Sequence, residues 1–204
     1  MKSKNTSHSS SIISRLHNKK HAGFSLVELL VSVAIFVIIT SVILAKHSKF
    51  SGTLLVENLA YDVALSIRKA QVFGLSIRES SPGVFDTGYG VHFDTSSNNS
   101  YIFFKDTNKN KKYDDSSEVL ETFSIGKGNT IAQFCTTLFT GVEKCSPSGI
   151  TYLDIIFERP NPDAIIKTNL TGDTYASAQI TVSSPEGVEW NIETITTGQI
   201  SIQE

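Results

Sequence analysis

The stretch that decides the fold of this chain begins with GFSLVELL at residues 23–30 and continues to Ala45. Residues 29–45 carry no charged side chain. A helix of about 20 apolar residues is long enough to cross a bilayer. Residues 24–45 are therefore predicted to form a transmembrane helix.

One carboxylate, that of Glu28, lies inside this apolar stretch. A carboxylate within a membrane helix costs several kcal/mol unless a partner compensates it, so a specific function is expected for it. The alternative is that Glu28 lies near the end of the span and reaches lipid headgroups or water. The basic residues before the stretch, and the Gly23–Phe24 junction, favour the functional interpretation.

The charges divide the chain into a basic leader and an acidic remainder. Residues 1–23 contain five basic residues and no acidic one, whereas the rest contains 13 basic and 20 acidic residues. The positive-inside rule predicts that the leader stays in the cytoplasm and that the C-terminal domain lies outside. An ordinary secretory signal peptide is the alternative, but no small-x-small cleavage site follows the apolar stretch. The acidic remainder lacks the basic stripe that would indicate nucleic-acid binding.

The helical pattern continues beyond Ala45 but becomes amphipathic. Spacings of three and four predict a helix over residues 46–80 that buries one apolar face. The sequence SSPG at residues 80–83 is predicted to end it. The apolar face is formed by Leu55, Leu59, Val63, Ile67 and Ala70.

Residues 81–204 are predicted to form a β-rich globular domain. Alternating patterns separated by turn residues predict a hairpin whose turn is residues 94–100, and a second hairpin around residues 184–187. One long helix followed by many strands predicts an α+β fold in which the helix packs on an antiparallel sheet. The expected strands are residues 89–93, 101–104, 119–125, 131–134, 151–157, 178–182, 189–195 and 199–202.

The residues around Gly23 resemble the N-terminal processing motif of the type IV pilin and pseudopilin superfamily. Two lysines, Lys19 and Lys20, precede the glycine, and a long apolar helix follows it. The resemblance implies that a prepilin peptidase cuts after Gly23 and methylates Phe24. It also implies that Glu28, the fifth mature residue, pairs with the N-terminal ammonium of a neighbouring subunit in a fibre.

Parts of the C-terminal domain resemble the GspH/FimT-like branch of that superfamily. The similar segments are residues 66–70, the YGVHF strand at 89–93, the FFKDTN segment at 103–108 and the TGQI strand at 197–200.

Two cysteines, Cys135 and Cys145, lie in the part of the chain that the resemblance places outside the cytoplasm. A disulfide is expected there, and a closed loop of about ten residues would stabilise the fold by roughly 2–3 kcal/mol. The alternative is a pair of free buried thiols.

The segment from Asp106 to Glu118 is a candidate for a structural Ca²⁺ site. Calcium prefers six to eight oxygen ligands. The loop lacks the glycine that normally permits the sharp turn, and its last carboxylate falls one residue late, so a solvated Asx-rich loop is the alternative. The candidate ligands are Asp106, Asn108, Asn110, Asp114 and Glu118.

No catalytic pattern is present, since the sequence has no Gly-x-Ser-x-Gly elbow, phosphate-binding loop or His-Glu-x-x-His motif. No enzyme activity and no cofactor beyond the candidate Ca²⁺ are predicted. The expected function is that of a minor pilin or pseudopilin in a type IV pilus-like or type II secretion-like fibre. Its partners would be other pilin subunits, prepilin peptidase and the inner membrane. The alternative is a single-pass, membrane-anchored adhesin or binding domain that never polymerises.

Overall fold

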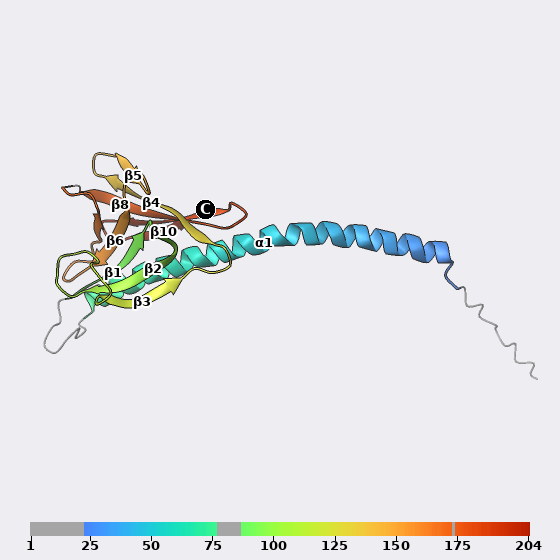
Figure 1. The fold of residues 1–204 in the computed structure, drawn as a ribbon, viewed down its shortest axis with the longest axis horizontal. Coiled ribbons are helices and arrows are strands. Elements are labelled where there is room, and N and C mark those ends of the chain that lie inside the picture. Colours follow the sequence, from blue (N-terminus) through green and yellow to red (C-terminus); the bar gives the residue numbers. More distant parts are fainter. Residues whose placement is uncertain (1–22, 77–86, 173) are drawn as a thin grey trace, which may run out of the picture. The chain divides into compact units, whose positions relative to one another are not determined.

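The computed structural model describes residues 23–76, 87–172 and 174–204, and of these the side chains of residues 45–51 are left out of the description. The chain divides into two compact units, Met1–Ala45 and Lys46–Glu204, which are described separately below. The helix α1 (Leu26–Leu75) contributes its first part to the N-terminal unit and its remainder to the C-terminal unit (Figure 1). The predicted leader, residues 1–23, lies outside the described residues except for Gly23.

The helix α1 begins and ends at residues slightly inside the predicted bounds. It starts at Leu26 rather than Phe24 because Ser25 caps it: the Ser25 Oγ accepts a hydrogen bond from the N–H of Glu28. It ends at Leu75. The predicted helix end at residues 80–83 lies outside the described residues.

The C-terminal unit contains ten described strands in two five-stranded antiparallel sheets (Figure 1). The first sheet has the order β3-β2-β1-β6-β7 and the second the order β10-β9-β8-β4-β5. The strands are β1 (Gly88–Asp94), β2 (Ser97–Asp106), β3 (Val119–Ser124), β4 (Thr130–Leu138), β5 (Glu143–Cys145), β6 (Tyr152–Phe157), β7 (Ile165–Thr168), β8 (Tyr175–Ser183), β9 (Glu189–Ile195) and β10 (Ile200–Gln203).

The apolar face of α1 packs into one core that both sheets share. Of the five predicted helix positions, four are buried, while Leu55 is only partly buried because its neighbour Val56 takes the inward position. Each fully buried side chain of this kind stabilises the fold by about 1.5–3 kcal/mol. The strands contribute, among others, Val91, Phe103, Leu153, Phe157, Ile180 and Ile192 to this core.

Gly74 allows the last turn of α1 to lie directly against strand β6. A Cβ atom at this position would collide with the carbonyl oxygen of Phe157. Because backbone atoms cannot move aside as a flexible side chain can, a residue larger than glycine would push α1 away from the sheet.

The α+β class is confirmed, with three corrections to the details. The strands form two sheets rather than one. The first hairpin turns within residues 94–97 rather than over 94–100, because the polar residues Ser97 to Ser100 already pair as part of β2. Strands β5 and β7 were not predicted; they are three and four residues long and sit at sheet edges.

Candidate functional site

The N-terminal unit presents apolar side chains on every side of its helix. Leu26–Leu44 is long and apolar enough to cross a membrane, and it lies entirely exposed. Phe24 is 79% exposed and Leu30 is 62% exposed. A helix that is apolar all round is stable only within lipid or against other apolar surfaces, so this unit needs an environment other than water.

Glu28 is the third residue of α1, and this position gives it a local structural role. Ser25 and Glu28 have the Ser-x-x-Glu spacing of a capping box, and the distance from the Glu28 N to the Ser25 Oγ is 3.1 Å. A carboxylate in the first turn is also favoured by the helix dipole. No group in the described part of the chain pairs with the carboxylate itself, which therefore stays available to a partner.

The other polar side chains of the apolar helix satisfy their hydrogen bonds within the helix. The hydroxyls of Ser32, Thr40 and Ser41 donate to carbonyl oxygens four residues earlier, at 2.7–2.9 Å. Such bonding lets Ser and Thr enter an apolar environment without an unsatisfied polar group. Glu28 is thus the polar side chain of this segment that needs a partner from elsewhere.

In the C-terminal unit, the residues of the candidate Ca²⁺ loop do come together, but their oxygens bind the loop's own N–H groups. The Asp106 carboxylate accepts from the backbone N–H groups of Asn110 and Lys111, at 3.1 and 2.8 Å. The buried Glu118 carboxylate accepts from the N–H groups of Thr107 and Asp114, at 2.9 and 3.1 Å. These hydrogen bonds hold the loop in shape through its own backbone donors.

The Asp114 carboxylate lies in the same loop, where it accepts hydrogen bonds from two side-chain amides and pairs with a lysine. The side-chain amides of Asn108 and Asn110 donate to its Oδ2, and the Lys112 Nζ lies 2.7 Å from its Oδ1. The hydrogen bond from Lys112, and then that from Asn108, lowers the pKa of Asp114 to about 2. An ionised carboxylate has about four lone-pair sites, so Ca²⁺ binding stays a prediction that a titration with the ion would test.

A buried hydrogen-bonded pair that sequence reasoning missed, His92 and Asp154, anchors the loop to the first sheet. Asp154 on β6 is fully buried, and its Oδ1 lies 2.6 Å from the Nδ1 of His92 on β1. Its Oδ2 accepts from the backbone N–H of Tyr113 at 3.1 Å. The Tyr113 ring lies 4.5 Å from the His92 ring, centroid to centroid. Burial raises the pKa of Asp154, while His92 opposes that shift.

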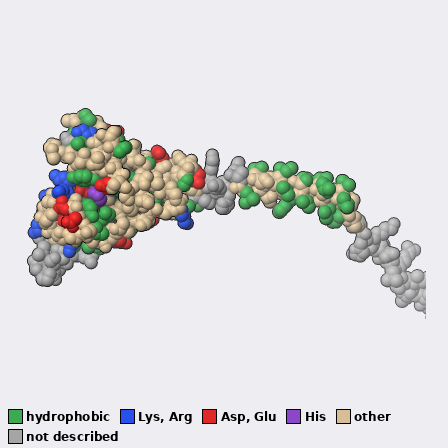
Figure 2. All heavy atoms as spheres, in the orientation of Figure 1, with side chains coloured by type: hydrophobic (Ala, Val, Ile, Leu, Met, Phe, Trp, Pro, Cys, Tyr) green, Lys and Arg blue, Asp and Glu red, His purple; other side chains and the backbone are tan. Residues whose placement is uncertain are grey.

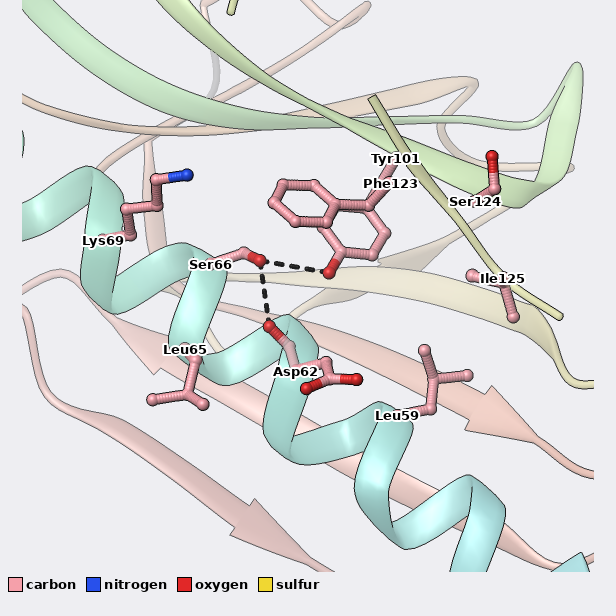
Figure 3. Close-up of a pocket in the computed structure, with 9 residues that line it drawn as sticks. All are labelled: Leu59, Asp62, Leu65, Ser66, Lys69, Tyr101, Phe123, Ser124 and Ile125. Atoms are coloured by element: carbon pink, nitrogen blue, oxygen red, sulfur yellow. Dashed lines mark hydrogen bonds between the residues drawn. The ribbon is translucent and has the colours of Figure 1, made fainter. Parts of the chain in front are cut away.

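A groove of about 370 Å³ lies between α1 and strands β2 and β3 (Figure 3). At its base the hydroxyls of Ser66 and Tyr101 lie 3.1 Å apart, and burial raises the pKa of Tyr101 to about 12. Lys69 closes one side: its Nζ lies 2.6 Å from the Glu121 carboxylate and 4.7 Å from the centre of the Phe103 ring. The hydroxyls of Ser66 and Tyr101 are thus paired with each other, and Lys69 is paired with Glu121.

Cys135 and Cys145 form a disulfide across the neighbouring strands β4 and β5. The two residues are directly opposite in the strand register. The bond therefore fixes β5, a strand of three residues at the sheet edge, to the rest of the second sheet.

An exposed apolar N-terminal helix, followed by an α+β domain with antiparallel sheets, defines a membrane-anchored, pilin-like class of protein. Residues 18–44 match the family model of the prokaryotic N-terminal methylation motif, the hallmark of type IV pilins and pseudopilins. The chain thus carries, over residues 18–44, the N-terminal motif that is typical of type IV pilin-like proteins. The comparisons with curated proteins and with solved structures found no match.

Proposed function

We propose that this protein is a structural subunit, a minor pilin or pseudopilin, of a type IV pilus-like or type II secretion-like fibre. Prepilin peptidase would cut after Gly23 and methylate Phe24. The subunit would wait in the inner membrane with its C-terminal unit outside, and then enter the fibre together with other pilin subunits. No catalytic role is assigned to it.

The observation that carries this proposal is the single unpartnered carboxylate in an otherwise self-satisfied apolar helix. Ser32, Thr40 and Ser41 bind carbonyls of their own helix, whereas the Glu28 carboxylate has no partner in the described chain. Cleavage after Gly23 would create an ammonium at Phe24, four residues from Glu28. In a packed bundle of such helices, the ammonium of one subunit would compensate the carboxylate of the next.

Glu28→Ala tests this pairing. Removing one member of a buried ion pair costs about 3–5 kcal/mol, which corresponds to a loss of about two to four orders of magnitude in the assembly equilibrium. Processing should continue, because Gly23 and Phe24 are unchanged. We expect the variant to be cut and methylated, as seen by mass spectrometry, but depleted from sheared or purified fibres.

Ser25→Ala is the matched control, because it removes the helix cap that Glu28 shares but leaves the carboxylate in place. If Glu28 acts only through the capping box, both variants should impair assembly equally. Normal fibre incorporation of Glu28→Ala would refute the pairing. The resemblance of the C-terminal domain to the GspH/FimT-like branch stays a prediction.

A further inference from the structure

A pocket of about 420 Å³ lies in the C-terminal unit beside β7, the edge strand of the first sheet, and Tyr175 at the start of β8 also lines it. It is bounded by the loop at residues 110–112, by the first residue of β6, and by β7 with the segment that follows it. Figure 2 shows basic and acidic side chains gathered with a histidine at one end of this unit. Among the side chains that line it are Lys111, Lys112, Tyr152, Lys167 and Asn169.

Among the described residues, Lys167 is the lysine of this pocket for which no ion-pair partner is present. In the strand register it lies opposite Asp154, which would be its natural partner across β6 and β7. Both oxygens of Asp154 are already taken, by the His92 ring and the Tyr113 N–H. Within the described residues no carboxylate pairs with Lys167, and its side chain is exposed.

Two further lysines flank the pocket in ion pairs that an incoming anion can compete with. The Lys111 Nζ lies 2.5 Å from the Glu158 carboxylate, and the Lys112 Nζ lies 2.7 Å from that of Asp114. The side chains of both lysines are more than 40% exposed. Exposed ion pairs contribute about 0–1 kcal/mol, so these lysines can turn toward a ligand at little cost.

The rest of the lining suits a ligand with hydroxyl groups and an apolar face. Asn169 uses its Oδ1 to accept from the Thr151 N–H at 2.8 Å, and its NH₂ group has no partner among the described residues. The hydroxyls of Thr168 and Tyr175 bind each other at 2.7 Å and fix the inner wall. Tyr152 adds a half-buried aromatic ring.

We propose that this pocket binds an acidic saccharide of the uronic acid class. Lys167, assisted by Lys111 and Lys112, binds the carboxylate. The Asn169 amide donates to a sugar hydroxyl, and the Tyr152 ring covers an apolar face of the sugar. Small-ligand sites typically combine apolar or aromatic walls with a small number of precisely placed polar groups. Binding at this pocket does not depend on fibre assembly.

The test is a calorimetric titration of the mature protein, residues 24–204, in detergent micelles with trigalacturonate. Lys167→Gln should weaken binding about tenfold to a hundredfold, because a hydrogen bond to a charged group is lost. Lys144→Gln makes the same charge change on β5, outside the pocket lining, and should alter the affinity less than about twofold. Unchanged thermal unfolding of both variants shows that they fold.

Two further ligands distinguish the contribution of the carboxylate to binding from that of the sugar. The methyl ester of trigalacturonate keeps the sugar but removes the charge, and it should bind at least about tenfold more weakly. Inorganic phosphate supplies a charge without the sugar, and it should bind more weakly than trigalacturonate. The proposal is overturned if trigalacturonate does not bind, if Lys144→Gln weakens binding as much as Lys167→Gln, or if the ester or phosphate binds as tightly as trigalacturonate.

Discussion

Replacing Asp154 should be among the most damaging single changes in the C-terminal unit. Its side chain is fully buried and holds two separate groups, the His92 ring at 2.6 Å and the Tyr113 N–H at 3.1 Å. Asp154→Ala leaves both groups without an acceptor. Breaking a buried pair in this way costs about 3–5 kcal/mol, which is a large part of the roughly 5–15 kcal/mol that stabilises a typical domain.

Urea unfolding of the full-length protein in detergent micelles measures this cost. Trp190 is the only tryptophan of the chain, and it lies on β9 in the second sheet. Its fluorescence therefore reports the unfolding of the C-terminal unit. Glu189→Ala, an exposed acidic residue beside it, is the control for the change in charge and should cost less than about 0.5 kcal/mol.

A double-mutant cycle with His92→Ala separates the His92–Asp154 interaction from the contact of Asp154 with the Tyr113 N–H. If the two side chains act on each other, the double variant should be more stable than the sum of the single effects predicts, by about 0.5–3 kcal/mol. A cost below about 1 kcal/mol for Asp154→Ala, or strictly additive effects, would refute the claim that this pair anchors the loop.

Three further changes follow from single contacts. Because the pKa of Asp114 is lowered to about 2, its contribution to stability should be full above about pH 4 and lost as the pH falls toward 2. The unfolding temperatures of wild type and Asp114→Asn should therefore converge over that range. A difference that stays constant with pH would contradict this prediction. Gly74→Ala should destabilise the protein by about 1–3 kcal/mol in urea, because the new Cβ meets the Phe157 carbonyl, whereas Gly126→Ala, where a Cβ meets nothing within 4 Å, is the control. Reduction of the disulfide, which closes a loop with a sequence separation of 10, should cost about 2–3 kcal/mol, and an unchanged urea midpoint after reduction would show that the bond does not stabilise the fold.

The helical half of the fold was predictable because its signals are local. The apolar stretch after Gly23, and the recurrence of Leu59, Val63 and Ile67, lie within a few helical turns. The Ser-x-x-Glu spacing at Ser25 was equally local and would have located the helix start at once. Short edge strands were missed, because a three-residue strand such as β5 carries no periodicity.

The polar contacts of the C-terminal unit could not be derived from the sequence. His92 and Asp154 are 62 residues apart, and only the pairing of β1 with β6 makes them opposite each other. The spacing of Asp106, Asn108 and Asn110 indicated oxygen ligands for an ion. It could not show that the loop would turn its own N–H groups toward these oxygens.

The central claim is that the apolar helix begins at a processed N-terminus and is built for assembly. Mass spectrometry of the mature protein, isolated from cells that also make prepilin peptidase, tests this claim most directly. The expected mature chain lacks residues 1–23 and begins with N-methylated Phe24. A mature chain that still begins at Met1, or that is cut behind the apolar stretch after Ala45, would contradict it.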